Sequence, residues 1–287
     1  MLARGSKILA LSLALVLSFS FWGCTEVGGL SQEEIDRLVA NTIDAYPEVT
    51  TVKFDMDMLM TLEVTGGTDP MKMTMAMGGS GAIDSTELEM QMTMDMMMDI
   101  PGLFKESMTT DCYIVGEWMY VKVAIPGVGE EWVREKVTAD VWQEQFDTTQ
   151  IEQQIEFLKT ATLISYLGSE TVNGADCYIF EVLPDMGELM GVLSEQQEAT
   201  GLDFSSMPDL GDLFQEMSLK MWIAKDSYQT MKTDLYMMME MLPGYVGATE
   251  DDFTRMTIVM SMTMSLYDYD EPVSITIPPE ALVAVKA

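Results

Sequence analysis

The sequence predicts an α+β protein with a strongly curved antiparallel sheet whose concave face is covered by helices. Three observations indicate this class. Long stretches of the chain alternate apolar and polar residues, which is the period of a strand with one buried face. Short glycine-rich or polar turns join successive stretches, as in antiparallel hairpins. Helical spacing of apolar residues is confined to the start of the domain and to segments in its middle.

The chain opens with a segment typical of an export signal. Arg4 and Lys7 precede an apolar stretch, residues 8–22, whose 15 residues fall short of the roughly 20 that a membrane-spanning helix needs. A small residue, Gly23, closes the stretch. We therefore expect residues 1–23 to be a signal peptide.

The cysteine that follows resembles the bacterial lipobox, in which a peptidase cuts before the cysteine and the thiol then carries diacylglycerol. Gly23 and Cys24 fit this pattern, whereas Phe21 and Trp22 stand where the lipobox normally has leucine and a small residue. We expect lipidation at Cys24, a short tether over residues 24–30, and attachment to the extracytoplasmic face of the cell membrane. An uncleaved anchor and a plain secretory signal are the alternatives.

A helix is predicted at the start of the domain. Ser31 and Glu34 have the spacing of a capping box, and the apolar residues after them return on one helical face. Pro47 ends this pattern. The residues on the predicted buried face are Ile35, Leu38, Val39, Thr42 and Ile43.

Three long strands are predicted next. In each, the apolar residues occupy alternate positions, and Gly78, Gly79, Ser80 and Gly81 are expected to end the second strand in a turn. The apolar sets are Val52, Phe54, Met56, Met58, Met60, Leu62 and Val64; Met71, Met73, Met75 and Met77; and Leu88, Met90, Met92, Met94, Met96 and Met98.

The rest of the chain predicts shorter strands around two helical segments. Helical spacing over residues 138–167 predicts one or two helices, and residues 185–215 are interpreted as a helical, mobile insertion. Residues 31–287 are expected to form one domain, because no repeat or low-complexity linker divides them. The other predicted strands are residues 112–116, 118–123, 132–137, 174–183, 217–223, 230–241, 255–266 and 272–277.

Composition excludes several classes of function. The 287 residues include 15 Lys and Arg against 47 Asp and Glu, a net charge of −32, so nucleic acid is not the expected partner. The sequence has no histidine, which removes Ser/His and Cys/His nucleophile pairs and histidine-based zinc sites. We expect no enzyme, no cofactor and no metal site.

The 30 methionines are the feature that needs an explanation. β-branched residues suit strands better, and methionine loses more rotamer entropy on burial, but it forms an adaptable apolar wall. Three interpretations compete: a cavity for acyl chains or another apolar ligand, a lineage-specific core filler without a ligand, and a Cu(I) site of thioethers. The first is preferred. Its expected cavity residues are Phe54, Met56, Met58, Met60, Met71, Met73, Met75, Leu88, Met90, Met92, Met94, Met231, Met237, Met239, Met256, Met260 and Met262.

Two cysteines remain after Cys24. Cys112 and Cys177 could pair in an exported protein, where disulfides persist, or could both be small buried apolar side chains. Both interpretations are open at this point.

Three segments resemble the LolA-like bacterial lipoprotein superfamily, especially its branch of LppX- and LprG-type lipoproteins. They are residues 113–122, which form a predicted hairpin, residues 172–180, and residues 267–281 at the C-terminal end. The resemblance implies a half-barrel of about eleven antiparallel strands wrapped over helices, with a hydrophobic cavity between them that receives lipid acyl chains. It also implies carriage of lipids or lipoproteins without catalysis.

The sequence thus predicts a lipid-anchored LolA-like lipoprotein that binds hydrophobic ligands. Lipid or another apolar molecule is the expected partner, the membrane is reached through the anchor, and a protein partner for transfer is left open. The alternative is an interaction or sensor lipoprotein of the cell envelope with a closed, ligand-free core, because the same fold also serves envelope-stress sensing.

Overall fold

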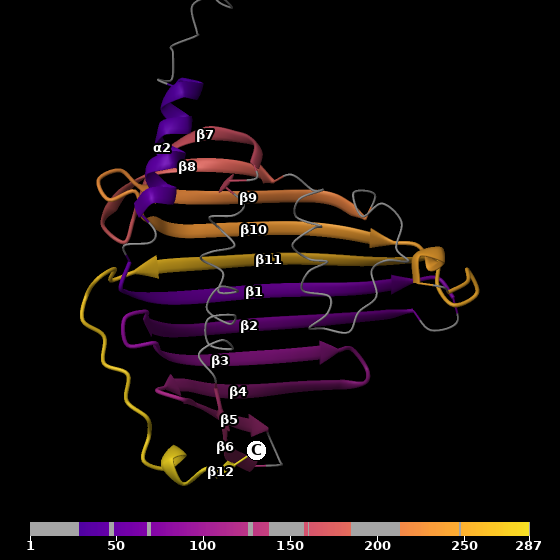
Figure 1. Cartoon of the computed structure of the whole chain (residues 1–287). Helices are drawn as coiled ribbons and strands as arrows, with labels where there is room; N and C mark the ends of the chain where they lie inside the picture. Colours follow the sequence, from indigo (N-terminus) through magenta and orange to yellow (C-terminus); the bar gives the residue numbers. More distant parts are fainter. Residues whose placement is uncertain are drawn as a thin grey trace, which may run out of the picture.

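The computed structural model describes residues 29–45, 49–67, 70–125, 129–137, 158–159, 161–184, 213–246 and 248–286. Within them the chain forms one open sheet in the order β12-β6-β5-β4-β3-β2-β1-β11-β10-β9-β8-β7 (Figure 1). The eleven strands β1 to β11 are antiparallel, and the two-residue β12 adds in parallel beside β6. The predicted open antiparallel half-barrel of about eleven strands is confirmed.

The elements have the following bounds. The helices are α2 (Gln32–Ala45), η4 (Pro243–Val246) and η5 (Ala281–Val283). The strands are β1 (Thr51–Thr65), β2 (Met71–Asp84), β3 (Glu89–Ile100), β4 (Phe104–Val115), β5 (Trp118–Ile125), β6 (Gly129–Lys136), β7 (Ala161–Val172), β8 (Ala175–Pro184), β9 (Phe214–Ala224), β10 (Thr230–Met241), β11 (Arg255–Tyr267) and β12 (Val285–Lys286).

Helix α2 begins as predicted and packs on one end of the sheet. The Ser31 backbone N–H donates to Glu34 Oε2 at 2.9 Å, and the Glu34 N–H donates to Ser31 Oγ at 3.3 Å, which is a capping box. Its buried residues Ile35, Leu38 and Val39 join a core cluster with residues of β8 and β9, and α2 lies beside β7 and β8 in Figure 1. Leu158, in the short helical piece of residues 158–159, is buried in the same cluster.

The glycine-rich turn predicted within the second strand is wrong. Residues 78–81 lie inside β2, where the strand pairs with β1 on one side and with β3 on the other. Gly81 is needed for close approach: a Cβ there would lie 2.5 Å from Phe54 Cζ and 2.5 Å from the Gln91 carbonyl oxygen. Glycine at this position therefore makes room for a ring that packs across β2.

One strand begins earlier than predicted, and another was not predicted at all. β4 begins at Phe104, eight residues before the predicted strand, because its polar first half pairs with the end of β3. β7 covers residues 161–167, which the sequence pattern predicted to be helical; Ile164 and Tyr166 pair with Val182 and Phe180 of β8. Tertiary pairing decides both cases, since the local spacing there fits a helix as well as a strand.

The strand predicted over residues 272–277 is also wrong. Its residues alternate in exposure, yet they belong to no strand of the sheet, and Pro272 and Pro278 lack the N–H groups that a ladder needs. The insertion predicted over residues 185–215 ends earlier than expected, because Phe214 and Gln215 already belong to β9. Residues 185–212, like 138–157 and 1–28, lie outside the described residues.

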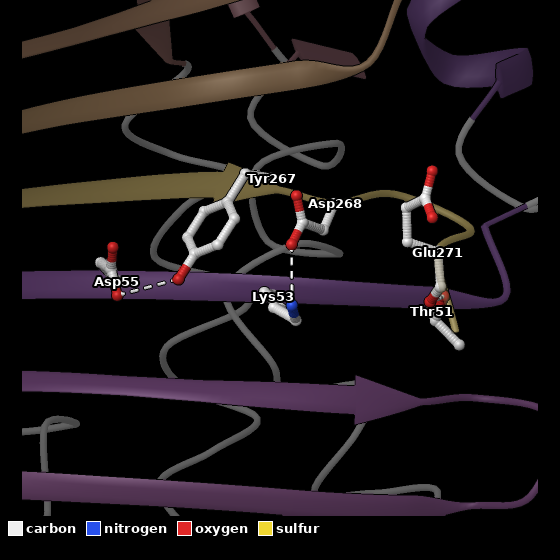
Figure 2. A network of polar contacts seen from close by, with 6 residues as sticks. All are labelled: Thr51, Lys53, Asp55, Tyr267, Asp268 and Glu271. Carbon is white, nitrogen blue, oxygen red and sulfur yellow. Dashed lines mark hydrogen bonds and ion pairs between the residues drawn. The ribbon is translucent and has the colours of Figure 1, made fainter. Parts of the chain in front are cut away.

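A polar network fastens the C-terminal segment to the start of β1 where the chain leaves β11 (Figure 2). Lys53 Nζ lies 2.7 Å from Asp268 Oδ2, and this hydrogen bond raises the pKa of Lys53. The Thr51 hydroxyl donates to the Glu271 carbonyl oxygen at 2.7 Å. These contacts come from the segment that resembles the lipoprotein family, and they direct the chain toward η5 and β12 at the far edge of the sheet.

Candidate functional site

The strand register gathers the methionines into two complete rows. In the first row, five methionines lie side by side on β11, β1, β2, β3 and β4: Met262, Met58, Met77, Met96 and Met108. In the second row, six lie side by side on β9, β10, β11, β1, β2 and β3: Met217, Met237, Met260, Met60, Met75 and Met98. The rows are two residues apart on each shared strand, so both belong to the same side of the sheet, which we call the methionine face.

Eight methionines form an unbroken block within these rows. β11, β1, β2 and β3 each contribute two, and neighbouring strands place their Cβ atoms roughly 5 Å apart. Larger apolar residues lie toward the strand ends, where Phe54 pairs with Leu266 and Leu62 pairs with Ile258. The methionine face is thus most uniform at the middle of the sheet.

The register places all but two of the predicted cavity residues on the methionine face. Leu88 is wrong, because it lies in the turn before β3 with a φ of +56° and is 44% exposed. Met231 is also wrong: a register shift near Thr230 turns it into a separate cluster with Cys177, Trp222 and Ala224. Met108 and Met217 belong to the rows but were missed, because each stands in a mostly polar stretch of sequence. Met77, Met96 and Met98 were predicted on the apolar strand faces but were not among the expected cavity residues, and they also belong to the rows.

Methionine is concentrated in one part of the sheet. The five adjacent strands β3, β2, β1, β11 and β10 contain 22 of the 30 methionines, whereas β5, β6, β7 and β8 together contain one, Met119. The apolar positions of those four strands hold valine, isoleucine, leucine, tyrosine and phenylalanine instead. This segregation argues against a general compositional bias as the origin of the methionine face.

Helix α2 packs on the same side of the sheet as the two methionine rows. Its cluster includes Leu219, which is cross-strand neighbour to Leu235 and through it to Met262. A hollow of about 610 Å³ lies between α2 and the start of β7. Its lining is Gln32, Asp36, Val39, Ala40, Ile43, Leu158, Lys159, Ala161, Thr162, Leu163 and Ile164. One edge of the methionine face is therefore covered by a helix with open space beside it.

The opposite side of the sheet, which we call the polar face, carries acids and hydroxyl groups. Thr93 donates to Asp111 at 2.8 Å, Thr109 to Asp95 at 2.6 Å and Thr263 to Asp234 at 2.7 Å. These pairs join neighbouring strands across the face.

A second hollow, of about 560 Å³, lies over β11, β1, β2, β3 and β4. Three consecutive residues from each strand line it, with the first methionine row at the middle of each triplet. Because residues two positions away on the methionine face do not line it, we place this hollow on the polar face, where Ala76, Gly78 and Ser107 leave room. It is therefore not the apolar site that the sequence predicts.

The two cysteines do not form a disulfide. Both are free and buried, and six strands separate β4, which carries Cys112, from β8, which carries Cys177. Burial raises the pKa of the Cys112 thiol to about 11. Burial also raises the pKa of Cys177, which is fully enclosed. Of the two interpretations, the structure therefore supports Cys112 and Cys177 as small buried apolar side chains.

Within the described residues no helix is long and apolar enough to cross a membrane. Cys24, the predicted lipidation site, lies outside the described residues, as do the signal peptide and most of the tether. Their role remains a prediction from the sequence.

Several solved structures are similar in fold. The lipoprotein LppX of Mycobacterium tuberculosis matches with a TM-score of 0.41 and 12% identity, over 86% of this chain and 100% of LppX. LprF of Mycobacterium bovis matches with a TM-score of 0.44 and 10% identity, over 87% of this chain and 99% of LprF. A DUF1329 family protein from Desulfovibrio piger matches with a TM-score of 0.23 and 11% identity, over 84% and 95%. LppX belongs to the lipoprotein branch that the three sequence segments resemble.

Comparison with curated proteins finds no match. The profile of a protein family described as a family of unknown function, DUF6612, matches residues 34–170 and 186–286. These ranges include most of the chain and all strands of the two methionine rows. The chain therefore belongs to the DUF6612 family.

Proposed function

We propose that this protein is a lipid-anchored lipoprotein of the extracytoplasmic membrane surface that binds apolar ligands, lipid acyl chains above all, against its methionine face. The observation that carries the proposal is the pair of uninterrupted methionine rows, which makes an apolar wall of flexible side chains over seven adjacent strands. Such a wall adapts to ligands of varying shape. The proposed role is carriage without catalysis, in keeping with a sequence that lacks histidine.

Energetics favour a carrier over a permanent store. Burying about sixteen methylenes from water is worth roughly 12 kcal/mol. A bilayer supplies the same stabilisation, so transfer between membrane and protein is close to neutral and therefore reversible. Direction then comes from relative concentrations or from a protein partner that accepts the ligand.

The test is ligand uptake by the mature chain, residues 24–287 with Cys24→Ser. Native mass spectrometry should show co-purified lipid, and fluorescent acyl probes should bind. Met58→Asp and Met92→Asp should abolish uptake while circular dichroism stays that of the folded protein, because each buries a carboxylate against the ligand. Leu59→Asp is the matched control, since Leu59 is 48% exposed on the polar face beside Met58.

The outcomes separate the competing functions. A folded chain with neither co-purified lipid nor probe uptake would favour the sensor or interaction lipoprotein. Uptake that survives both methionine variants would place the ligand elsewhere in the protein.

The block of eight methionines favours a second candidate function, binding of Cu(I) or another soft monovalent ion. Thioethers are ligands for Cu(I), and Met58, Met60, Met75 and Met77 lie on adjacent strands with no other residue between them. A Met58→Leu, Met77→Leu double variant keeps the apolar surface but removes two sulfurs. Loss of Cu(I) in a competition titration, with acyl-probe uptake retained, would support this candidate; affinity no better than that of free thioethers would reject it.

A further inference from the structure

The positive charges of strands β1 to β11 are segregated from the methionine face. Nine lysines and arginines lie on the eleven antiparallel strands, and the pairing register places every one of them on the polar face. They are Lys53, Lys72, Lys105, Lys122, Arg134, Lys136, Lys220, Lys232 and Arg255. Among these described strands, the methionine face thus has no cation.

Acids already engage many of the cations on the polar face. Lys53 pairs with Asp268 at 2.7 Å, Lys122 with Glu130 at 2.8 Å, and Lys232 with Asp234 at 2.8 Å. Lys105, Lys136 and Arg255 have acidic partners within 3.3 Å as well. These cations therefore lie on the side of the sheet opposite the methionine rows, and each is already paired with an acidic side chain.

The rest of the mature chain offers few further cations. Only Arg37, Lys159, Lys225 and Lys286 complete the thirteen Lys and Arg residues that follow Cys24. Arg37 is on the exposed side of α2, and Lys225 lies 5.2 Å over the Tyr178 ring. Lys159 borders the hollow between α2 and β7, at the edge of the sheet and away from the methionine rows.

On the described strands β1 to β11, the charges that do occur on the methionine face are negative. Glu106 follows Met98 in the second row and is exposed. Glu131 and Glu135 occupy the same face of β6. An anionic group that enters beside the rows would meet carboxylates and no counter-charge, at a surface of low polarity.

We infer that the ligand of the methionine face is an uncharged lipid or other neutral apolar molecule, and that anionic phospholipids are excluded. This inference rests on the proposed function and specifies its ligand class. Apolar burial provides the affinity, and the one-sided placement of cations provides the selection, because a phosphate leaves water only where a cation or several donors replace its hydration. Anionic lipids of the membrane would therefore not occupy the ligand site of the carrier.

The test compares ligands that share acyl chains and differ in the head group. Dioleoylglycerol and dioleoylphosphatidylglycerol are offered in vesicles of neutral phosphatidylcholine to the mature chain, residues 24–287 with Cys24→Ser, and the bound lipid is measured by native mass spectrometry. We expect dioleoylglycerol to be preferred by roughly ten-fold or more. Equal loading of the two lipids would overturn the inference and leave the proposed function intact, whereas no loading of either would overturn the proposed function.

A pair of charge-reversal variants separates local exclusion from general repulsion. Glu106→Lys and Glu63→Lys change the net charge equally, and both side chains are exposed, but Glu106 is on the methionine face and Glu63 on the polar face. We expect Glu106→Lys alone to raise loading of the anionic lipid. If both variants raise the loading of the anionic lipid equally, net charge is responsible and the assignment of the exclusion to the methionine face fails. Loss of anionic-lipid loading in Lys159→Gln would also overturn the inference, because it would place the head group at the hollow beside α2.

Discussion

At the scale of single residues, burial decides the chemistry of the cysteines. Cys112 packs with Ile114 and Val137, and Cys177 packs with Trp222 and Ala224. Neither thiol has a nearby cation that would favour the thiolate enough to offset its burial, so both are structural side chains. Spacing in the sequence could not show this, because the strand order that separates the cysteines is a property of the whole sheet.

The thiols should be unreactive in the native protein. The pKa of Cys112 is raised from 9.0 to about 11, so the folded state holds its proton where the unfolded state loses it. The contribution of the protonated thiol to the free energy of unfolding is fully present below about pH 9. It is lost as the pH rises from about 9 toward about 11, because deprotonation favours the unfolded state there. A thiol-reactive chromophore at about pH 8 should detect no native cysteine in the Cys24→Ser chain and two after denaturation.

Peptide mapping with and without reductant is the control for that experiment. A disulfide-linked pair of peptides in the non-reduced digest would contradict the assignment of two free thiols, as would rapid modification of the folded chain.

At the scale of elements, the fit between β1 and β2 depends on glycine. Gly81 lies opposite Phe54 in the register, and the Phe54 ring occupies the space that a side chain at Gly81 would fill. Gly78 lies three residues earlier in the same strand, where a Cβ would lie at ordinary contact distance, 3.4 Å from Asp57 Oδ1 and 3.9 Å from the Met56 carbonyl oxygen. Glycine is therefore required at position 81, whereas position 78 can accept a small side chain.

We expect Gly81→Ala to destabilise the fold by about 1–3 kcal/mol, because the added carbon overlaps the Phe54 ring and the Gln91 carbonyl oxygen. Gly78→Ala should be neutral or slightly stabilising, since it restricts the unfolded chain without a clash. Urea unfolding followed by circular dichroism measures both. Equal midpoints for the two variants would refute the close packing of Phe54 over β2.

At the scale of the whole molecule, charge and attachment are linked. The proposed removal of residues 1–23 would take away Arg4 and Lys7 and no acid, so 13 basic and 47 acidic residues would give the mature chain a net charge of −34. Anionic head groups repel such a protein. A covalent diacylglycerol with a further acyl chain is strong enough to hold it at the membrane, which one chain alone would hold only marginally.

The attachment is tested by metabolic labelling with an alkyne fatty acid. The wild-type chain should incorporate the label, and Cys24→Ser should not, because Cys24 is the only thiol expected to be acylated. Cys112→Ser is the control and should keep the label. Label in Cys24→Ser, or none in the wild type, would rule out the lipidated form and leave an uncleaved anchor or a secreted protein.

The sequence by itself determined the period of the strands, the capping box of α2 and the alternation of Met56, Met58 and Met60, because these features depend on neighbours a few residues apart. It could not place Leu88 in a turn, keep residues 78–81 in a strand or turn Met231 away from the rows. Those outcomes depend on register, and a shift of one residue exchanges the faces of a strand. Only the tertiary structure decided that methionines from seven strands meet in two rows and that the cations of the eleven antiparallel strands lie on the opposite face. Both properties arise from pairing between residues as far apart in the chain as Met58 and Met262.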